Sequence, residues 1–383
     1  MRPALAGQTI RLTLGELVIT SALTIDGSSL PQPITLSADR TGNGKTSDDT
    51  YIILLTSGDL LLDSLTLTGV NCVASSGCIT VRPSAAFTLT LDHCTISGNA
   101  GYHASALYCT DSQARPTDTI TIRNSTITGN SVFKGPAVLD VFYCNLTIQN
   151  STFSQNQAGA ISFRSGGPSS AFSISNSTII GNPANFGAGG LYLDLEYNRL
   201  PSTVYINNTI CTGNTPANVS ISPDLIVSGS NNLLTGNPLL APLGDYGGPT
   251  RTMPPLTTSP AIDAGGATTL TTDQRGFPRD AKPDIGAVEY QGTRNLAAPI
   301  LDSAGDAILS FGTPSNTPGF AWVLSRSPAL TPGSFTEIYR YQGGADIATP
   351  GTTFVRTAAF ITVTDANAPS GSGYYRIDLL PVP

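Results

Sequence analysis

Apolar and polar residues alternate along much of the first 240 positions of the chain, as in Ile120-Thr121-Ile122-Arg123 and Phe172-Ser173-Ile174-Ser175. A period of two is typical of a strand with one buried face. Gly-Asn pairs at 98–99, 129–130, 181–182 and 213–214 separate these runs, and both residue types tolerate a positive φ, so the chain is expected to turn there. The pattern predicts short strands joined by turns and leaves no room for a long helix.

The alternating runs belong to a seven-residue motif that recurs along the chain. Its copies begin at Ser64, His93, Asn124, Asn150, Asn176 and Asn208, and successive copies are 26 to 32 residues apart. A repeat of this length predicts a solenoid. If successive coils stack about 4.8 Å apart, each strand pairs with its equivalent in the next coil. The sequence therefore predicts an all-β fold built on a parallel β-helix.

The first residue of each motif copy forms a column of mostly polar side chains. Because stacked side chains can hydrogen-bond along the axis or cap the turn backbone, we expect an inward asparagine ladder at a bend. Asn124, Asn150, Asn176 and Asn207 also begin Asn-x-Ser/Thr sequons. Their repetition at a turn favours an architectural role over glycosylation.

A second strand column follows each turn. We align 78–82, 106–110, 137–141, 160–164 and 190–194, whose second members are Ile79, Leu107, Val138, Ile161 and Leu191. These apolar residues should point inward, and the third and fifth members should point outward. The fourth member is apolar except at Asp140. Either this aspartate is a buried, hydrogen-bonded carboxylate, or the alignment slips by one residue there.

Composition narrows the classes of partner. The 383 residues carry a net charge of −7, and only 12% are charged. Mild acidity and the lack of a dense basic run argue against a nucleic-acid partner. No apolar stretch reaches the roughly 18 residues of a membrane helix. Met1 to Gln8 show no signal-peptide pattern, and 9–14 already alternate like a strand, so the chain is expected to begin inside a fold.

The six cysteines at 72, 78, 94, 109, 144 and 211 allow two interpretations. They are either buried small apolar residues, or Cys72 and Cys78 form a disulfide across a short loop, as an oxidising compartment would permit. Neither the cysteine nor the histidine spacing suits a zinc site. No metal and no cofactor are expected.

The residue pattern changes after position 240, where the repeats end. After a β-helix over 1–240, residues 241–292 contain Gly247-Gly248-Pro249 and Met253-Pro254-Pro255, which prevent regular strand pairing. We expect this segment to cap the open end of the solenoid, held by Asp273, Arg275, Asp284 and Glu289. After a linker at 291–298, short strands within 299–383 predict a small antiparallel β-sandwich with Trp322 in its core.

Two groups of segments carry a family resemblance. The repeats form one group, and the other lies in 231–250, 259–265, 272–276 and 284–289, with Ser-Pro-Ala-Ile-Asp-Ala-Gly at 259–265. Over about residues 9–290, the chain resembles right-handed parallel β-helix proteins of the pectate-lyase-like superfamily. More narrowly, it resembles bacterial surface proteins related to the polymorphic outer-membrane proteins, with a choice-of-anchor module after the helix. The resemblance implies a right-handed β-helix in an exported bacterial protein, extracellular or at the cell surface.

The outward column of the second strand is the best candidate for binding. Tyr108, Arg164, Tyr192 and Asp194 could hold a sugar chain by stacking and hydrogen bonds, although ordinary surface decoration is the simpler interpretation. If the protein is an enzyme, Asp140, Arg164, Asp194 and Glu196 are the candidate catalytic residues. His93 is expected in the asparagine column and His103 in an exposed loop. The sequence pattern does not indicate a Ser-His-Asp triad.

Three functions remain open at this stage. The sequence favours a non-catalytic surface protein, expected to be monomeric, that presents a β-helix face to a polysaccharide or cell-surface glycan. The first alternative is a polysaccharide lyase or glycoside hydrolase that acts on an extended sugar chain. The second is a purely structural stalk, because this fold serves many roles.

Overall fold

A computed structural model describes residues 5–42, 51–72, 77–110, 115–166, 170–185, 187–195, 202–290, 299–312, 320–328, 335–356, 360–369 and 374–381. The chain divides into two compact units. The first comprises Met1–Pro238, Gly248–Met253 and Pro260–Glu289, and the second comprises Leu239–Gly247, Pro254–Ser259 and Tyr290–Pro383. The described residues contain no α-helix, and so none that could cross a membrane.

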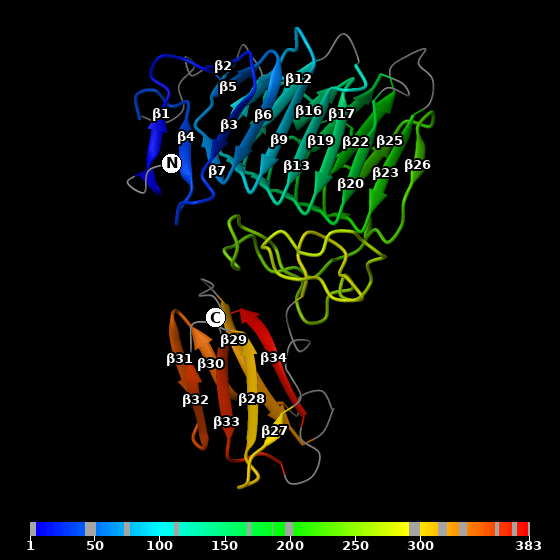
Figure 1. The fold of residues 1–383 in the computed structure, drawn as a ribbon. Coiled ribbons are helices and arrows are strands. Elements are labelled where there is room, and N and C mark those ends of the chain that lie inside the picture. The colour runs from blue at the N-terminus through cyan, green and yellow to red at the C-terminus, as the bar shows by residue number, and fades with distance from the viewer. Residues whose placement is uncertain are drawn as a thin grey trace. The chain divides into compact units, whose positions relative to one another are not determined.

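The first unit is a solenoid of three parallel sheets (Figure 1). Sheet A contains β1 (Thr9–Arg11), β4 (Ile34–Ser37), β7 (Leu65–Thr68), β10 (Thr95–Ser97), β14 (Thr126–Thr128), β18 (Thr152–Ser154), β21 (Thr178–Ile180) and β24 (Ile210–Thr212). Sheet B contains β2 (Leu17–Ile19), β5 (Ile53–Leu55), β8 (Ile79–Val81), β12 (Leu107–Thr110), β16 (Ala137–Phe142), β19 (Gly159–Ser165), β22 (Leu191–Leu195) and β25 (Val219–Ile221). Sheet C contains β3 (Leu23–Asp26), β6 (Gly58–Asp63), β9 (Phe87–Asp92), β13 (Thr119–Arg123), β17 (Asn145–Gln149), β20 (Phe172–Ser175), β23 (Thr203–Asn207) and β26 (Ile226–Ser228). A short pair, β11 (Ala100–Gly101) and β15 (Ser131–Val132), lies between sheets A and B in the chain.

The period of two fills the interior, as predicted. In sheet C one inward column pairs residues from five successive coils, each at most 1% exposed: Leu89, Ile120, Leu146, Phe172 and Val204. Their outward neighbours are mostly threonine and serine, which suit a pleated surface. Like side chains therefore stack in register from coil to coil, and backbone pairing between coils holds the stack together.

The first motif residue lies at a bend, as predicted, and Asn150 donates to the Asn124 Oδ1 one coil away at 3.4 Å, but the prediction that this column is the inward ladder is wrong. Ser64, His93, Asn124, Asn150, Asn176 and Asn208 all have φ between 45° and 57°, so this column is the bend itself between sheets C and A. Asparagine is common there because it tolerates the left-handed conformation. These side chains point away from the core, and Asn150 and Asn208 donate to the carbonyls of Thr272 and Gly266.

The inward ladder is made by the other asparagine, the last residue of each motif copy. Its members are Asn99, Asn130, Asn156, Asn182 and Asn214, all at most 6% exposed. The Asn156 Oδ1 accepts from both the backbone N–H and the side-chain amide of Asn130, at 3.1 Å each. Its own amide donates to the carbonyl of Ile127 at 3.1 Å and to the Asn182 Oδ1 at 2.9 Å. The same pattern repeats along the ladder, so each buried amide finds partners.

Residues 248–253 and 260–289, the lateral segment, pack along sheet A. Gln274 is fully buried: its amide donates to the hydroxyls of Thr126 and Thr250, and its Oε1 accepts from the Thr152 hydroxyl. The backbone N–H of Ala287 donates to the Thr178 hydroxyl on the next coil. The segment thus lies against the side of several successive coils, a placement that the expectation of an end cap missed.

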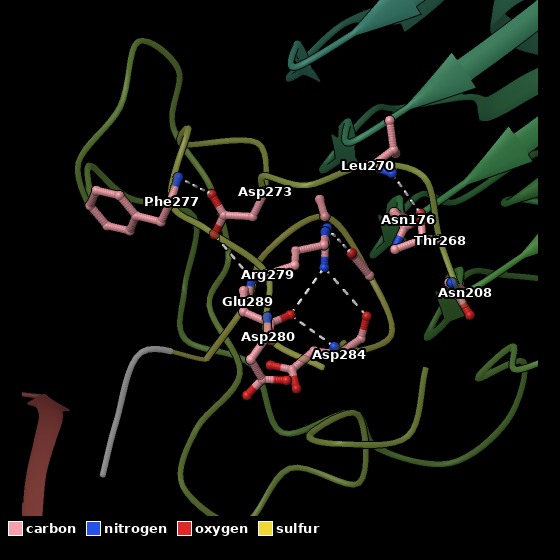
Figure 2. A network of polar contacts seen from close by, with 12 residues as sticks. Asn176, Asn208, Thr268, Leu270, Asp273, Phe277, Arg279, Asp280, Asp284 and Glu289 are labelled. Carbon is pink, nitrogen blue, oxygen red and sulfur yellow. Dashed lines mark hydrogen bonds and ion pairs between the residues drawn. The ribbon is translucent and has the colours of Figure 1, made fainter. Parts of the chain in front are cut away.

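A buried ionic network holds the lateral segment, as the sequence predicted (Figure 2). Asp273 pairs with Arg275 at 2.7 Å, and Arg279 pairs with Glu289 at 3.3 Å. The backbone N–H of Asp284 donates to the Glu289 carboxylate at 2.8 Å. Burial raises the pKa of Glu289 to about 7, and hydrogen bonds to the carboxylate and the nearby Arg279 only partly offset it.

Replacing Gln274 by alanine should loosen the lateral segment. The change removes the acceptor of the Thr152 hydroxyl, and a buried polar group left without a partner costs about 1–3 kcal/mol. The Thr126 and Thr250 hydroxyls also lose a donor, although they still donate to backbone carbonyls. Limited proteolysis should cleave the Gln274→Ala variant within 260–289 at least about tenfold faster than the wild-type protein. Exposed Gln157 offers a control, and equal cleavage of Gln157→Ala and Gln274→Ala would contradict this account.

The second unit contains two four-stranded antiparallel sheets around one core. The first consists of β27 (Ile300–Leu301), β28 (Ala307–Gly312), β33 (Phe360–Asp365) and β32 (Thr352–Arg356), and the second of β31 (Ala345–Ala348), β30 (Thr336–Gln342), β29 (Phe320–Ser327) and β34 (Tyr374–Pro381). Leu309 and Val363 from the first share a buried cluster with Leu324 and Ile338 from the second. Trp322 is half-buried at its margin, so it is not the central core residue expected.

The cysteines follow the first of the two interpretations. All six are buried, and none is in a disulfide, including Cys72 and Cys78. The alternative interpretation, a disulfide across that short loop, is therefore not present in the structure.

Candidate functional site

The outward-facing columns of sheet B bring most of the candidate residues together. One column contains Thr80, Tyr108, Asp140, Ser162 and Tyr192, and the column two residues further on contains Thr110, Phe142, Arg164 and Asp194. We call this surface the sheet B face. The register differs from our alignment at one coil, because Leu107 pairs with Leu139 and not with Val138. The second explanation for Asp140 is therefore correct: the alignment slipped, and Asp140 belongs to the outward column.

Five rings form a continuous series along the sheet B face, which we call the aromatic run. Tyr102 meets His103 edge-on at 4.8 Å between ring centroids, and His103 stacks on Tyr108 at 5.7 Å. Tyr108 and Tyr143 each contact Phe142 edge-on, at 6.1 and 5.9 Å. His103 is exposed, as expected, but its contact with Tyr108 places it in the candidate site. Tyr192 lies in the same column as Tyr108, three coils further along, against Gly187.

Charged groups flank the rings. The guanidinium of Arg164 lies 4.8 Å from the centre of the Phe142 ring, and its Nε is 3.7 Å from the Asp194 carboxylate. Lys134 lies 5.4 Å from the Tyr102 ring centre. Cation–π contacts of this kind are worth about 0.5–1 kcal/mol at exposed sites. They hold the cations beside the rings, where both can meet a ligand.

Asp140 differs from the other charged groups because it is buried. It is 2% exposed, and its Oδ1 has no hydrogen-bond partner. Burial raises the pKa of Asp140 to about 7, and a hydrogen bond with Ser162 and the charge of Arg164 only partly offset it. A carboxyl group that titrates near neutral pH beside a cation is a feature of acid–base sites, although structural groups also show it.

The four residues proposed for catalysis are only partly brought together. Asp140 and Asp194 are in coils two steps apart, or about 9.6 Å along the axis at ~4.8 Å per step. Glycosidase carboxyl groups are about 5–9.5 Å apart and open to the substrate. The buried position of Asp140 does not meet the second condition. Glu196 lies outside the described residues.

A separate polar cluster lies at the bend between sheets C and A. One ligand atom from each of Asp63, Asp92 and His93 lies within 4.8 Å of the others. Asp92 already accepts hydrogen bonds from Arg123 at 2.7 Å and Asn124 at 2.9 Å. These three side chains could hold a divalent cation only if Arg123 moved away, because the Arg123 guanidinium already pairs with the Asp92 carboxylate.

Comparison with known families agrees with this geometry. Residues 68–248 match the family model described as the right handed beta helix region. This chain is a parallel β-helix repeat protein. The match spans the coils that carry the aromatic run, and no curated protein matches the chain. Because the β-helix fold serves many activities, the match by itself assigns none to this β-helix protein.

Sequence reasoning missed four members of the site in this β-helix protein: Tyr102, Lys134, Phe142 and Tyr143. Phe142 ends the one misaligned strand and Tyr143 follows it, so the one-residue slip left Phe142 outside the aligned columns. Tyr102 and Lys134 precede their strands in loops whose path the repeat does not define. A correct register would have revealed Phe142, but the loop residues carried no comparable signal.

Proposed function

We propose that this protein is a non-catalytic, exported bacterial surface protein that binds a sugar chain on the sheet B face. The observation that carries the proposal is the aromatic run, whose rings span adjacent coils and are flanked by Arg164 and Asp194. Sugar rings stack their C–H faces on aromatic side chains, and charged groups at the edge bond their hydroxyls. A long series of coils suits an extended polymer better than a compact ligand.

A glycan array with wild-type protein and a Tyr108→Ala variant tests this function. We expect binding to one class of polysaccharide or surface glycan, weakened about tenfold or more in the variant, because loss of a central aromatic anchor costs at least about 1.4 kcal/mol. The matched control is Tyr205→Ala, since Tyr205 is a 44% exposed tyrosine on sheet C. Equal binding by both variants would place the ligand elsewhere, and no binding by the wild type would favour a structural stalk.

A polysaccharide lyase or glycoside hydrolase is the second candidate. It is favoured by one observation, the raised pKa of Asp140 beside Arg164. Incubation with a panel of acidic and neutral polysaccharides distinguishes the two functions. Product release that disappears in Asp194→Ala would establish an enzyme and overturn the non-catalytic proposal.

The proposed function also includes a cellular location and an oligomeric state. A low-charge β-helix suits the extracellular space or the cell surface, and we propose that it acts there as a monomer. Light scattering after size-exclusion chromatography measures the mass, and a dimer at micromolar concentration would contradict the second part.

A further inference from the structure

Two cysteines of adjacent coils lie in contact beneath the aromatic run. Cys109 is the third residue of β12, and its partner in the next coil is Val141 of β16. Cys144 follows three residues after Val141, where the chain turns towards β17. The two sulfur atoms are 3.5 Å apart, and both side chains are fully buried in the main core.

The separation suits a cross-link. A disulfide requires about 2.05 Å between the sulfurs, so the pair needs to close by about 1.5 Å, shared between two side chains. Both residues belong to neighbouring coils whose strands are hydrogen-bonded at Cys109 and Val141, which holds the two coils together beside the pair. We propose that Cys109 and Cys144 form a disulfide in the mature protein. This inference does not depend on the proposed ligand.

The chemistry requires a disulfide oxidant from the compartment in which the protein folds. The thiolate of one cysteine attacks the oxidant, forms a mixed disulfide with it and releases one thiol. The thiolate of the second cysteine then attacks the mixed disulfide, so that the Cys109–Cys144 bond forms and the second oxidant thiol leaves. The two cysteine protons end on the two released thiols. Because both sulfurs are buried after folding, the reaction takes place before the coils close over them.

The bond would link the two coils that carry the aromatic run. Cys109 follows Tyr108 directly, and Cys144 follows Tyr143 directly, so each cysteine is one residue from a ring of the aromatic run. The closed loop contains about 35 residues, and a cross-link of that length removes considerable entropy from the unfolded chain. Disulfides persist in oxidising compartments, so this one also fits an exported protein.

Thiol counting in the full chain tests the bond. The protein is refolded from denaturant with reduced and oxidised glutathione, denatured again, and alkylated with iodoacetamide before and after reduction. We expect four alkylated cysteines before reduction and six after it, with one cross-linked peptide pair joining Cys109 to Cys144. Six alkylated cysteines before reduction, or a peptide pair joining any other cysteines, overturns the proposal.

Thermal unfolding gives a second measurement. Reduction should lower the midpoint of the wild-type protein by roughly 5 °C. The same treatment should leave the Cys109→Ser variant unchanged, while a Cys72→Ser control should respond like the wild type. If Cys109→Ser does not fold, the comparison of oxidised and reduced wild type still decides, because an unchanged midpoint contradicts a stabilising bond.

Discussion

Replacing Asn156 by alanine will lower the free energy of unfolding of the β-helix by about 3 kcal/mol or more. The side chain occupies the middle of the inward ladder and makes four hydrogen bonds, two accepted from Asn130 and one donated to each of Ile127 and Asn182. Alanine leaves the backbone N–H of Asn130 and the carbonyl of Ile127 buried without these partners, and each such group costs about 1–3 kcal/mol.

Urea denaturation followed by far-ultraviolet circular dichroism measures this loss. The matched control is Asn185→Ala, because Asn185 is exposed and the substitution is the same. A surface change of this kind should stay within about 0.5 kcal/mol of the wild type. If both variants lost the same free energy, the ladder would not be the stabilising element we describe.

The second large effect is on the pH dependence of stability. Burial raises the pKa of Asp140 from 3.8 and that of Glu289 from 4.5, in each case to about 7. A group with a higher pKa in the folded state binds its proton more tightly there, so its contribution stabilises the protein at low pH. That contribution is lost as the pH rises from about 4 to about 7. Because a tenfold difference in proton affinity corresponds to about 1.4 kcal/mol, Asp140 accounts for up to about 4 kcal/mol, and Glu289 contributes in the same direction.

Unfolding free energies of wild type, Asp140→Asn and Glu289→Gln between pH 4 and pH 8 test this expectation. Each variant should gain stability relative to the wild type as the pH rises, because the uncharged amide avoids the cost of a buried charge. Asp26→Asn is the control, since hydrogen bonds from Ser28 lower the pKa of Asp26 and its carboxylate is ionised in both states over this range. Its curve should therefore run parallel to that of the wild type. Parallel curves for wild type and Asp140→Asn would show that Asp140 is not held as described.

The sequence predicted the solenoid because its information is local and repeated. Alternation in stretches such as 120–123 and 172–175 defines strands, and the repeat length defines stacking. It could not decide which asparagine of the motif faces inward, since asparagine recurs at both positions, in four of six copies at the first and in five of six at the last. That choice depends on φ, which is positive at the first position and makes it the bend. Only the backbone path shows that the asparagine at the last position of the motif points inward.

The candidate site was predicted in part for a different physical reason. Ala137, Val138 and Leu139 are all apolar, so the alternating pattern does not choose between two registers in β16, and our alignment took the wrong one. Tyr108, Arg164, Tyr192 and Asp194 lie in unambiguous strands and were assigned correctly to the outward face. The contributions of Tyr102 and Lys134 depend on loop paths, which follow from three-dimensional packing.

The position of the ladder also shows where the coils can differ in length. In five coils, ten positions separate the inward residue of sheet C from the ladder asparagine: Leu89 to Asn99, Ile120 to Asn130, Leu146 to Asn156, Phe172 to Asn182 and Val204 to Asn214. All differences in coil length therefore fall on the two stretches that flank sheet B. Insertions and deletions can reshape the rims of the sheet B face while the opposite corner, against which the lateral segment packs, keeps its dimensions. The stretch from sheet C to the ladder thus has a constant length, while the loops beside sheet B vary in length. The variable loops border the surface that carries the aromatic run.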